Sequence, residues 1–306
     1  MFRSIAFTIF VLKKKGVIVQ ATIQYFNSID AAKILGVNVS TIKRWTLEGK
    51  LECVTSSGGH RKFLFAHFVN FLQQNQKKIA KSDFFPLSRK AHSRLVWHIL
   101  KGNYDAVVQP MLKYALKFDR GMVHNILNCF SLAQHPINEI FDHVLTPVLH
   151  QVGDLWERGE ISIFDEHFAS QAIRDGLARM QGGLKAPDKI IGNVFCLNMS
   201  SELHDIALKM VDHILEMRGF NIFFSGQVSP SFDVHRIVTK IQPVRIYVSS
   251  TYVANKSMIQ MEFDRIVESC NPHNITIFVG GRGFDVINYD PQRVQRLHTF
   301  KEVAIV

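Results

Sequence analysis

Residues 190–224 of the chain, IIGNVFCLNMSSELHDIALKMVDHILEMRGFNIFF, decide the fold of its C-terminal part. Ile190–Leu197 and Phe220–Phe224 are apolar runs of strand length, and Ile206–Met217 between them carries apolar residues at helical spacing. A strand, a helix and a second strand in this order predict two parallel strands joined by a right-handed crossover.

The same alternation continues to the C-terminus. It predicts a doubly wound, flavodoxin-like parallel sheet of the α/β class over residues 188–306, a fold that binds ligands at the carboxyl ends of its strands. The other expected strands are Val244–Val248, Ile275–Val279 and Val303–Val306, and the other expected helices are Asp233–Lys240 and Lys256–Cys270.

Residues 88–183 are long amphipathic segments with few strand signals. This pattern predicts a bundle of four or five helices as a separate domain. The expected helices are Ser88–Gly102, Tyr104–Asp119, Met122–Ala133, Pro136–Glu157 and Ser162–Gln181.

Residues 28–75 predict a small α-helical module with a β-ribbon. A first helix begins at Ser28 and ends at Gly36, and Ser40 is expected to cap a second helix, Thr41–Glu48. Two short helices joined by a tight turn and followed by a ribbon form a winged helix-turn-helix. The ribbon and a third helix are expected at Leu51–Thr55, Arg61–Phe65 and Ala66–Gln74.

The positive charge of the chain is concentrated in its first third. Residues 1–90 hold 15 Lys and Arg against 4 Asp and Glu, whereas residues 91–306 hold 21 against 22. A basic module joined to a near-neutral body favours a nucleic-acid partner and argues against a uniformly basic coat protein or a single-domain enzyme. Four widely spaced cysteines, without a C-x-x-C pair, exclude a Cys-rich zinc module and favour the reducing cytoplasm.

Two segments are expected to lie outside the domains. Residues 1–27 are predicted to be an N-terminal extension, whose apolar stretch is too short to span a bilayer and lacks the order of a signal peptide. Residues 76–87 are predicted to be a linker to the helical bundle. The sequence contains no transmembrane segment, so we expect no membrane partner.

Three elements of the basic module carry a resemblance to a known family. They are Ile29-Asp-Ala-Ala-Lys-Ile-Leu-Gly-Val37, Ser40-Thr-Ile-Lys-Arg-Trp45 and Gly58-Gly-His-Arg-Lys-Phe63, and in this order they resemble the MerR/excisionase-like DNA-binding domain. Side chains of the second helix can reach phosphates or base edges, and the resemblance implies that cations of the wing contact the DNA backbone. The residues expected to contact double-stranded operator DNA are Ser40, Thr41, Lys43, Arg44, His60, Arg61 and Lys62.

The loop after the first strand of the sheet contains Glu202-Leu-His204-Asp-Ile-Ala207. Forty-one residues separate Ala207 from Ser249, and 28 separate Thr251 from the next fragment, which begins at Gly280. This register resembles the D-x-H-x-x-G, S-x-L and G-G fragments of corrinoid-binding domains, and the domain is similar to the cobalamin-binding fold of methionine synthase and methylmalonyl-CoA mutase. Ala207 stands where that family has Gly, and Thr251 where it has Leu.

The resemblance implies a role for each of these residues. His204 is the lower axial ligand of cobalt, since imidazole suits a transition metal, and Glu202 takes the place of the family's Asp as the acceptor for the other ring nitrogen. Ser249 lines the channel for the benzimidazole tail. The glycines let the backbone approach the nucleotide end. The other expected cofactor-binding residues of this domain are Thr251, Gly280, Gly281 and Gly283.

The helical region carries a second signature. Trp156, nine residues and then Glu166-His167 match the W-x9-E-H pattern of one subfamily's helical cap. On one continuous helix Trp156 and His167 would lie about 16 Å apart, but Gly159 breaks the helix and Ser162 can cap a new one. The resemblance implies that Trp156 covers the upper face of the cofactor and that Glu166 and His167 hydrogen-bond an adenosyl group.

Together the three parts are similar to the MerR-type cobalamin-dependent transcriptional regulators, the CarH/LitR group of light-responsive repressors, over Ser28 to Val306. The resemblance implies a non-enzymatic regulator in which adenosylcobalamin, bound in the dark, favours a homo-oligomer (dimer or tetramer) that holds operator DNA until light breaks the cobalt–carbon bond. Glu157 stands where light-responsive members have a His that ligates cobalt after photolysis, which leaves His143 and His150 as alternative ligands.

Two other functions stay open. The chain could be the same DNA-binding regulator sensing another tetrapyrrole, or no cobalamin at all, and absorption spectra would separate these cases. It could also be a corrinoid methyl carrier, against which the winged module argues because such a carrier needs no DNA contact. The sequence shows no Ser/His/Asp, paired-carboxylate or H-E-x-x-H arrangement that would predict catalysis.

Overall fold

The computed structural model describes residues 25–35, 37–64, 67, 68, 70, 71, 87, 92–133, 135–181, 187, 189–200, 202–226 and 233–306. The predicted extension up to residue 24, and the predicted linker apart from Leu87, lie outside these residues. The chain divides into two compact units, Met1–Asn103 with Asn128–Gln134, and Tyr104–Leu127 with His135–Val306. The predicted bundle, residues 88–183, therefore contributes helices to both units.

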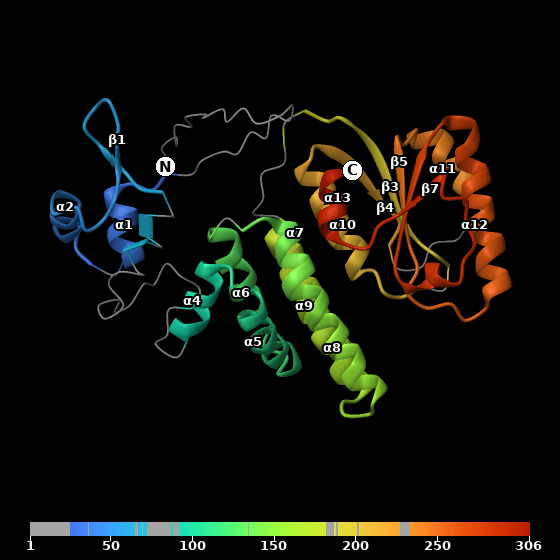
Figure 1. Cartoon of the computed structure of the whole chain (residues 1–306), viewed down its shortest axis with the longest axis horizontal. Coiled ribbons are helices and arrows are strands. Elements are labelled where there is room, and N and C mark those ends of the chain that lie inside the picture. The colour runs from blue at the N-terminus through green and yellow to red at the C-terminus, as the bar shows by residue number, and fades with distance from the viewer. Residues whose placement is uncertain are drawn as a thin grey trace. The chain divides into compact units, whose positions relative to one another are not determined.

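The N-terminal unit contains the two helices and the ribbon that the sequence predicts (Figure 1). They are α1 (Ser28–Leu35), α2 (Val39–Leu47), β1 (Val54–Thr55) and β2 (Arg61–Lys62), with the two strands antiparallel. The prediction that Ser40 caps α2 is wrong. The N-cap is Asn38, which has extended backbone angles, and Ser40 lies inside the first turn of the helix.

An aromatic core holds this unit together. Phe26 pairs with Phe63 as an isolated bridge, and both rings pack on Phe68 with centroids 5.7 Å apart. The helix-turn-helix unit thus begins before residue 28. Trp45 packs against Phe71 at 4.6 Å, which places its ring on the core side of α2, as the sequence predicts.

The helices of residues 93–181 follow the predicted segments closely. Helix α4 (Ser93–Lys101) belongs to the N-terminal unit, as does the end of α6 (Arg120–Leu132). The second unit contains α5 (Asp105–Leu116) and one long helix that passes through a π-helical turn. The segments of this long helix and the one after it are α7 (Ile137–Ile140), η2 (Phe141–Leu145), α8 (Thr146–Glu157) and α9 (Ile163–Gln181).

The C-terminal part of the second unit is a five-stranded, fully parallel sheet in the order β4-β3-β5-β6-β7. This is the flavodoxin-like order, with the switch point between β3 and β5. Figure 1 shows α10 and α13 on one face of the sheet and α11 and α12 on the other. The elements are β3 (Gly192–Asn198), α10 (Ile206–Met217), β4 (Phe220–Phe224), α11 (Val234–Ile241), β5 (Arg245–Ser249), α12 (Lys256–Cys270), β6 (Thr276–Gly280), β7 (Val294–Arg296) and α13 (Phe300–Ile305).

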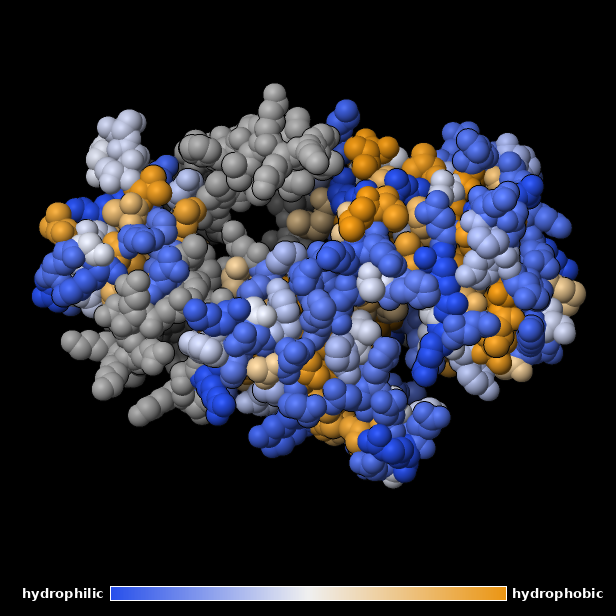
Figure 2. All heavy atoms as spheres, viewed as in Figure 1, coloured by the Kyte–Doolittle hydropathy of each residue, from blue (hydrophilic) through white to orange (hydrophobic). Residues whose placement is uncertain are grey.

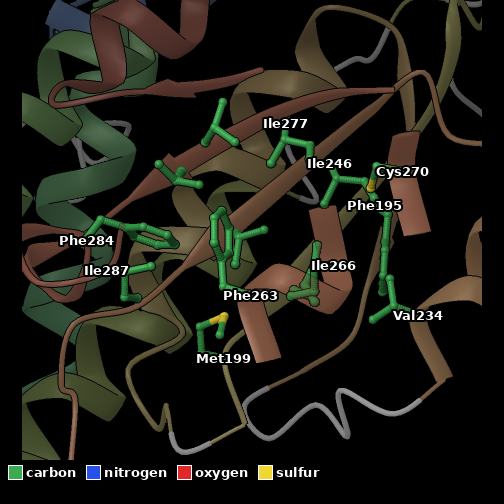
Figure 3. Packing of buried hydrophobic residues seen from close by; sticks show 14 of the residues in the cluster. Phe195, Met199, Val234, Ile246, Phe263, Ile266, Cys270, Ile277, Phe284 and Ile287 are labelled. Carbon is green, nitrogen blue, oxygen red and sulfur yellow. The ribbon is translucent and has the colours of Figure 1, made fainter. Parts of the chain in front are cut away.

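The main core of the sheet lies beneath α11 and α12. Alternate residues of the strands, such as Phe195, Ile246 and Ile277, interlock with Phe263 and Ile266 of α12 (Figure 3). Side chains of a strand alternate between its faces, so Asn198 and Ser249 point toward the α10 face at the carboxyl ends of β3 and β5. The core therefore fixes the edge at which ligands bind in such folds.

The predicted strand Val303–Val306 is wrong. Residues 300–305 form helix α13, and the fifth strand is β7, which precedes it. Thr299 and Glu302 form a capping box at the start of α13, and Asp142 of the π-helical turn accepts hydrogen bonds from the Phe300 and Lys301 amides. The local capping box and the long-range contact from Asp142 together outweigh the strand preference of Val303 and its neighbours.

None of the helices in the described part of the chain is long and apolar enough to cross a membrane.

Candidate functional site

The His204 loop, residues 199–205 apart from Ser201, leaves the carboxyl end of β3 and carries the central residues of the site. Glu202 is fully buried, whereas 64% of the His204 side chain is exposed. One carboxylate oxygen of Glu202 accepts the His204 backbone N–H at 2.7 Å and pairs with Nδ1 of the ring at 2.6 Å. The other accepts the backbone N–H groups of Thr251 and Tyr252.

Hydrogen bonding sets the charges of this pair. Burial alone would raise the pKa of Glu202, but the hydrogen bonds from the His204 ring and the Thr251 amide outweigh burial and hold that pKa below its usual value. The bond to Glu202 is the main cause that raises the pKa of His204 above its usual value. Since Nδ1 is engaged by the carboxylate, Nε2 is the ring nitrogen that faces outward.

The residues predicted after β5 and β6 lie at the same edge of the sheet. Ser249 ends β5, is buried, and accepts the Met199 amide of the His204 loop at 3.1 Å. The Thr251 contact to Glu202 uses the backbone, so it does not depend on whether Thr or Leu stands there. Ala207 lies in the first turn of α10 with its methyl group exposed.

Packing within the fold explains why two of the predicted positions are glycine. Gly281 has φ +97°, and a Cβ there would lie 2.2 Å from the Ser250 carbonyl oxygen. A Cβ on Gly283 would lie 2.2 Å from Ser250 Oγ. Gly280 has more room, because the nearest atom to its Cβ would be 3.7 Å away. Close packing of the loop after β6 on Ser250 therefore accounts for Gly281 and Gly283.

The cap residues lie on either side of a tight connection. Trp156 is near the end of α8 and half exposed, and Gly159, with φ +71°, terminates that helix. Ser162 and Asp165 then cap α9 reciprocally, with the Ser162 amide 2.8 Å from the Asp165 carboxylate and the Asp165 amide 3.2 Å from Ser162 Oγ. The helix break predicted from Gly159 and Ser162 is therefore present.

Glu166 lies in the first turn of α9. Its carboxylate accepts the Ser170 hydroxyl at 2.6 Å and pairs with the ring of His167, which is largely exposed. The charge of Glu166 adds to the rise in the His204 pKa, and Arg282, in the loop after β6, opposes it. The structure thus brings Glu166, Arg282 and His204 within electrostatic range.

Aromatic side chains surround the first turn of α9 without being buried. Phe164 is 66% and Phe168 53% exposed, and Phe168 packs edge-on against the half-exposed Phe118 at 5.1 Å. Figure 2 shows hydrophobic side chains gathered at this end of the α8–α9 pair. Exposed aromatic groups beside exposed polar ones form a surface suited to an amphipathic ligand.

The predicted DNA-contacting residues lie on α2 and the wing. Lys43 and Arg44 are exposed, and the Arg44 guanidinium lies 4.0 Å from the Glu48 carboxylate. In the wing, Ser56 accepts the backbone amides of Gly59 and His60, which holds the turn. Ser40 and His60 are exposed, and Thr41, Arg61 and Lys62 are half-buried. The cationic groups therefore lie on two neighbouring elements of a helix-turn-helix.

Sequence reasoning missed two residues that hold this site together. Arg174 of α9 forms a two-pronged ion pair with Asp205, the residue after His204, at 2.7 and 2.6 Å. Glu262 of α12 is buried and accepts both the amide and the hydroxyl of Ser200, at 2.9 and 2.6 Å. The four-residue spacing of Glu166, Ser170 and Arg174 indicates that they share one helix face. The sequence does not indicate which residues these side chains contact.

The residues fit a corrinoid with one protein ligand. A metal-binding His needs its second ring nitrogen hydrogen-bonded, and Glu202 supplies that bond from a buried, backbone-anchored position. Within the described residues, no group of three or more His, Cys, Asp or Glu is arranged to hold a metal ion, so the metal assignment depends on His204. His143 is paired with Glu139 at 3.3 Å and stacked on Tyr104.

Two protein-family models match parts of the chain between residues 25 and 181. A helix-turn-helix domain model matches residues 25–76, and a B12 binding domain model matches residues 95–181, which form helices α4 to α9. The chain therefore combines a region that matches a helix-turn-helix domain with one that matches a B12 binding domain.

The chain is CarH-like. It is 27% identical over 265 residues to the HTH-type transcriptional repressor CarH of Myxococcus xanthus, covering 82% of this chain and 87% of CarH. Dimethylamine corrinoid protein 3 of Methanosarcina acetivorans is 28% identical over 102 residues, which cover 33% of this chain and 48% of that protein. The monomethylamine corrinoid protein of Methanosarcina barkeri shares the fold, with a TM-score of 0.54 at 18% identity, over 64% of this chain and 94% of that one.

Proposed function

We propose that this protein is a transcriptional repressor whose operator binding is controlled by adenosylcobalamin and light. The observation that carries the proposal is the exposed His204 on a buried Glu202, at the carboxyl edge of a parallel sheet, in a chain that begins with a helix-turn-helix. The similarity to CarH and the corrinoid relatives supports the same conclusion.

In this proposal the lower half of the site is built by the sheet. His204 offers Nε2 to cobalt, while Glu202 holds the ring in place and keeps Nδ1 engaged. Glu202 is itself fixed by two backbone amides after β5, so the orientation of the ring does not depend on flexible side chains. Ser249, Thr251 and the glycines after β6 form the surroundings of the nucleotide tail.

The cap forms the upper half. Trp156 covers the upper face of the cofactor. Glu166 and His167 form hydrogen bonds with an adenosyl group. When bound, the cofactor supplies a cobalt–carbon bond that light cleaves. The half-exposed aromatic groups around the start of α9 exclude water from that face once it is covered.

The basic module binds operator DNA as part of a homo-oligomer, a dimer or a tetramer. Lys43 and Arg44 of α2 enter the major groove with Ser40 and Thr41, and His60, Arg61 and Lys62 of the wing contact phosphates. A single module has few cations, so an assembly that presents several modules together binds more tightly than one that comes apart.

The test is an absorption spectrum combined with gel filtration. Purified protein mixed with adenosylcobalamin in the dark should be red after desalting and elute as a dimer or tetramer. Green light should change both the spectrum and the elution volume. A colourless protein with the same elution volume in dark and light would overturn the proposal.

A second candidate function keeps the DNA binding but changes the sensor. Glu157, at the end of α8, stands where light-responsive members of the resembling family carry a second cobalt-binding His. A carboxylate suits that site less well, so a stable two-histidine photoproduct is not expected. Reconstitution with linear tetrapyrroles and with several cobalamins, compared by their spectra, separates this candidate from the first.

A further inference from the structure

One face of helix α9 is a polar stripe. Glu166, Ser170, Arg174 and Gln181 follow one another at intervals of four, four and seven residues, which places them on one side of the helix. An adjoining face of α9 is apolar and packs in the helical bundle. Its buried residues are Ala169, Ala172, Ile173, Gly176, Leu177 and Met180.

The polar stripe contacts the sheet domain at two points. Gln181 donates a hydrogen bond to Glu216 near the end of α10. The two terminal nitrogens of Arg174 lie 2.7 and 2.6 Å from the two carboxylate oxygens of Asp205. Only 5% of the Asp205 side chain is exposed. Glu166 lies within electrostatic range of His204. Helix α9 therefore rests on the His204 loop and α10 through polar contacts.

The Arg174–Asp205 pair occupies the central place in this stripe. Asp205 directly follows His204 and is the N-cap residue of α10, so its position and that of His204 are linked through one peptide bond. Arg174 lies eight residues after Glu166, about 12 Å along a rigid helix. Fixing Arg174 on Asp205 therefore fixes the first turn of α9 relative to His204.

We propose that Arg174 is a positioning residue, which seats α9 on the His204 loop through its two-pronged ion pair with Asp205. It thereby sets where Glu166 and His167 stand above His204. The inference rests on the proposed cobalamin site, although the seating of α9 itself needs no cofactor. Arginine suits the task because its planar fork binds both carboxylate oxygens at once, which a lysine cannot do.

A second ion pair on α9 provides a matched control. Arg120, at the start of α6, pairs with Asp175, the neighbour of Arg174 in the sequence. This pair joins α9 to another helix of the bundle, and the Arg120 side chain is 60% exposed. It resembles the Arg174 pair in chemistry and lies on the same helix, but it does not touch the sheet domain.

The first experiment uses the cofactor-free full-length protein. Hydrogen–deuterium exchange is compared between wild type, Arg174→Gln, Arg174→Lys and Arg120→Gln. We expect Arg174→Gln to speed amide exchange about 10-fold in the His204 loop and in the first turn of α9, with Arg174→Lys restoring part of the protection. Arg120→Gln should leave the His204 loop unchanged.

Two results would overturn the positioning role. One is unchanged exchange of the His204 loop in Arg174→Gln. The other is faster exchange spread evenly over the whole sheet, with a lower melting temperature and no rescue by lysine, because that pattern marks general destabilisation. Asp205→Asn provides a second route, since it removes the same pair from the other side and should reproduce the local pattern.

The second experiment adds hydroxocobalamin and follows the absorption band that reports the lower cobalt ligand. Arg174→Gln should bind about 10-fold more weakly than wild type, with a smaller share of histidine-ligated cobalt. Equal affinity and an equal spectrum in the two proteins would contradict the role toward the cofactor. If wild type binds no cobalamin, the proposed function fails, while the exchange experiment still decides whether Arg174 seats α9.

Discussion

The His204 loop and the start of α9 carry the two halves of the candidate site, and they are built in opposite ways. Glu202 is fully buried and anchored by three backbone amides, so His204 is held before any ligand arrives. At the start of α9, Phe164 is 66% exposed and His167 pairs only with its neighbour Glu166 in the contacts described.

The difference shows how a site can divide its tasks. A ligand to a metal must be oriented in advance, because a free imidazole would lose rotamer freedom on binding. Groups that cover the other face gain by staying open, since they can admit a bulky ligand and become buried only afterwards. The His204 loop therefore carries the fixed side chain, whereas the exposed side chains at the start of α9 can adapt to a ligand.

The largest expected effect is a difference in stability between variants of the two halves. Glu202→Ala leaves the amides of His204, Thr251 and Tyr252 without their acceptor, and we expect it to lower the free energy of unfolding by about 3 kcal/mol. Phe164→Ser, at the exposed half, should change it by less than about 0.5 kcal/mol. Urea unfolding of both variants measures the contrast. Equal effects would mean that the loop is no better fixed than the start of α9.

The next effect concerns cofactor binding. His204→Ala should weaken cobalamin binding about 100-fold and remove the spectrum of histidine-ligated cobalt, because it deletes the proposed ligand. His167→Ala should keep that spectrum and alter only the discrimination between adenosylcobalamin and hydroxocobalamin. Titrations followed by absorbance compare the two variants. An unchanged spectrum in His204→Ala would show that another residue is the lower ligand.

The stability of the fold is expected to depend on pH through His213, a buried residue of α10. Burial lowers the pKa of His213 in α10 to about 4, with Glu216 and Lys209 acting in opposite senses, while the unfolded chain titrates near 6.5. As the pH falls from about 6.5 to about 4, the unfolded state takes up a proton that the folded state does not, so stability is lost across that window. The loss should approach about 3 kcal/mol.

His213→Leu is the variant that tests this assignment. Neither ring nitrogen of His213 has a hydrogen-bond partner among the described residues, so leucine removes the titration without breaking a bond. Its free energy of unfolding, measured in urea at several pH values, should fall less steeply than that of wild type. Parallel curves would assign the acid sensitivity to other groups.

The smallest expected effect is on DNA binding by the exposed cations of the basic module. Arg44→Ala removes a phosphate or base contact and should weaken operator binding about 10-fold, with the slope of log K against log salt reduced by about 1. Arg236→Ala, an exposed cation on α11, is the control and should leave both quantities unchanged. Fluorescence anisotropy at several salt concentrations measures them.

Local patterns predicted most of the helices and strands. Phe220–Phe224, Ile206–Met217 and Lys256–Cys270 begin and end where the sequence places them, because apolar spacing and flanking turns act within a few residues. The two helices and the ribbon of the winged module followed in the same way from its turns, although the predicted cap of α2 was wrong. The strand–helix alternation also predicted that the strands of the sheet are parallel, whereas their order comes from the structure.

Local patterns failed where two local preferences competed. Val303 and its neighbours favour a strand, yet Thr299 and Glu302 form a capping box that starts a helix. The carbonyl of Val303 then accepts a hydrogen bond from Arg218, which secures the last turn from outside. Helix α2 begins at Val39, after the N-cap residue Asn38, and the Asn38 side chain makes no capping hydrogen bond, so side-chain capping did not decide where this helix starts.

The sequence by itself determined the pair at the centre of the site, since Glu202 and His204 are two residues apart and a short loop can join them. Only the tertiary structure decided what holds that pair. The amides of Thr251 and Tyr252, the carboxylate of Glu262 and the guanidinium of Arg174 reach the His204 loop from three other elements. Contacts between residues so far apart in the chain depend on how the helices and strands pack, which no spacing in the sequence records.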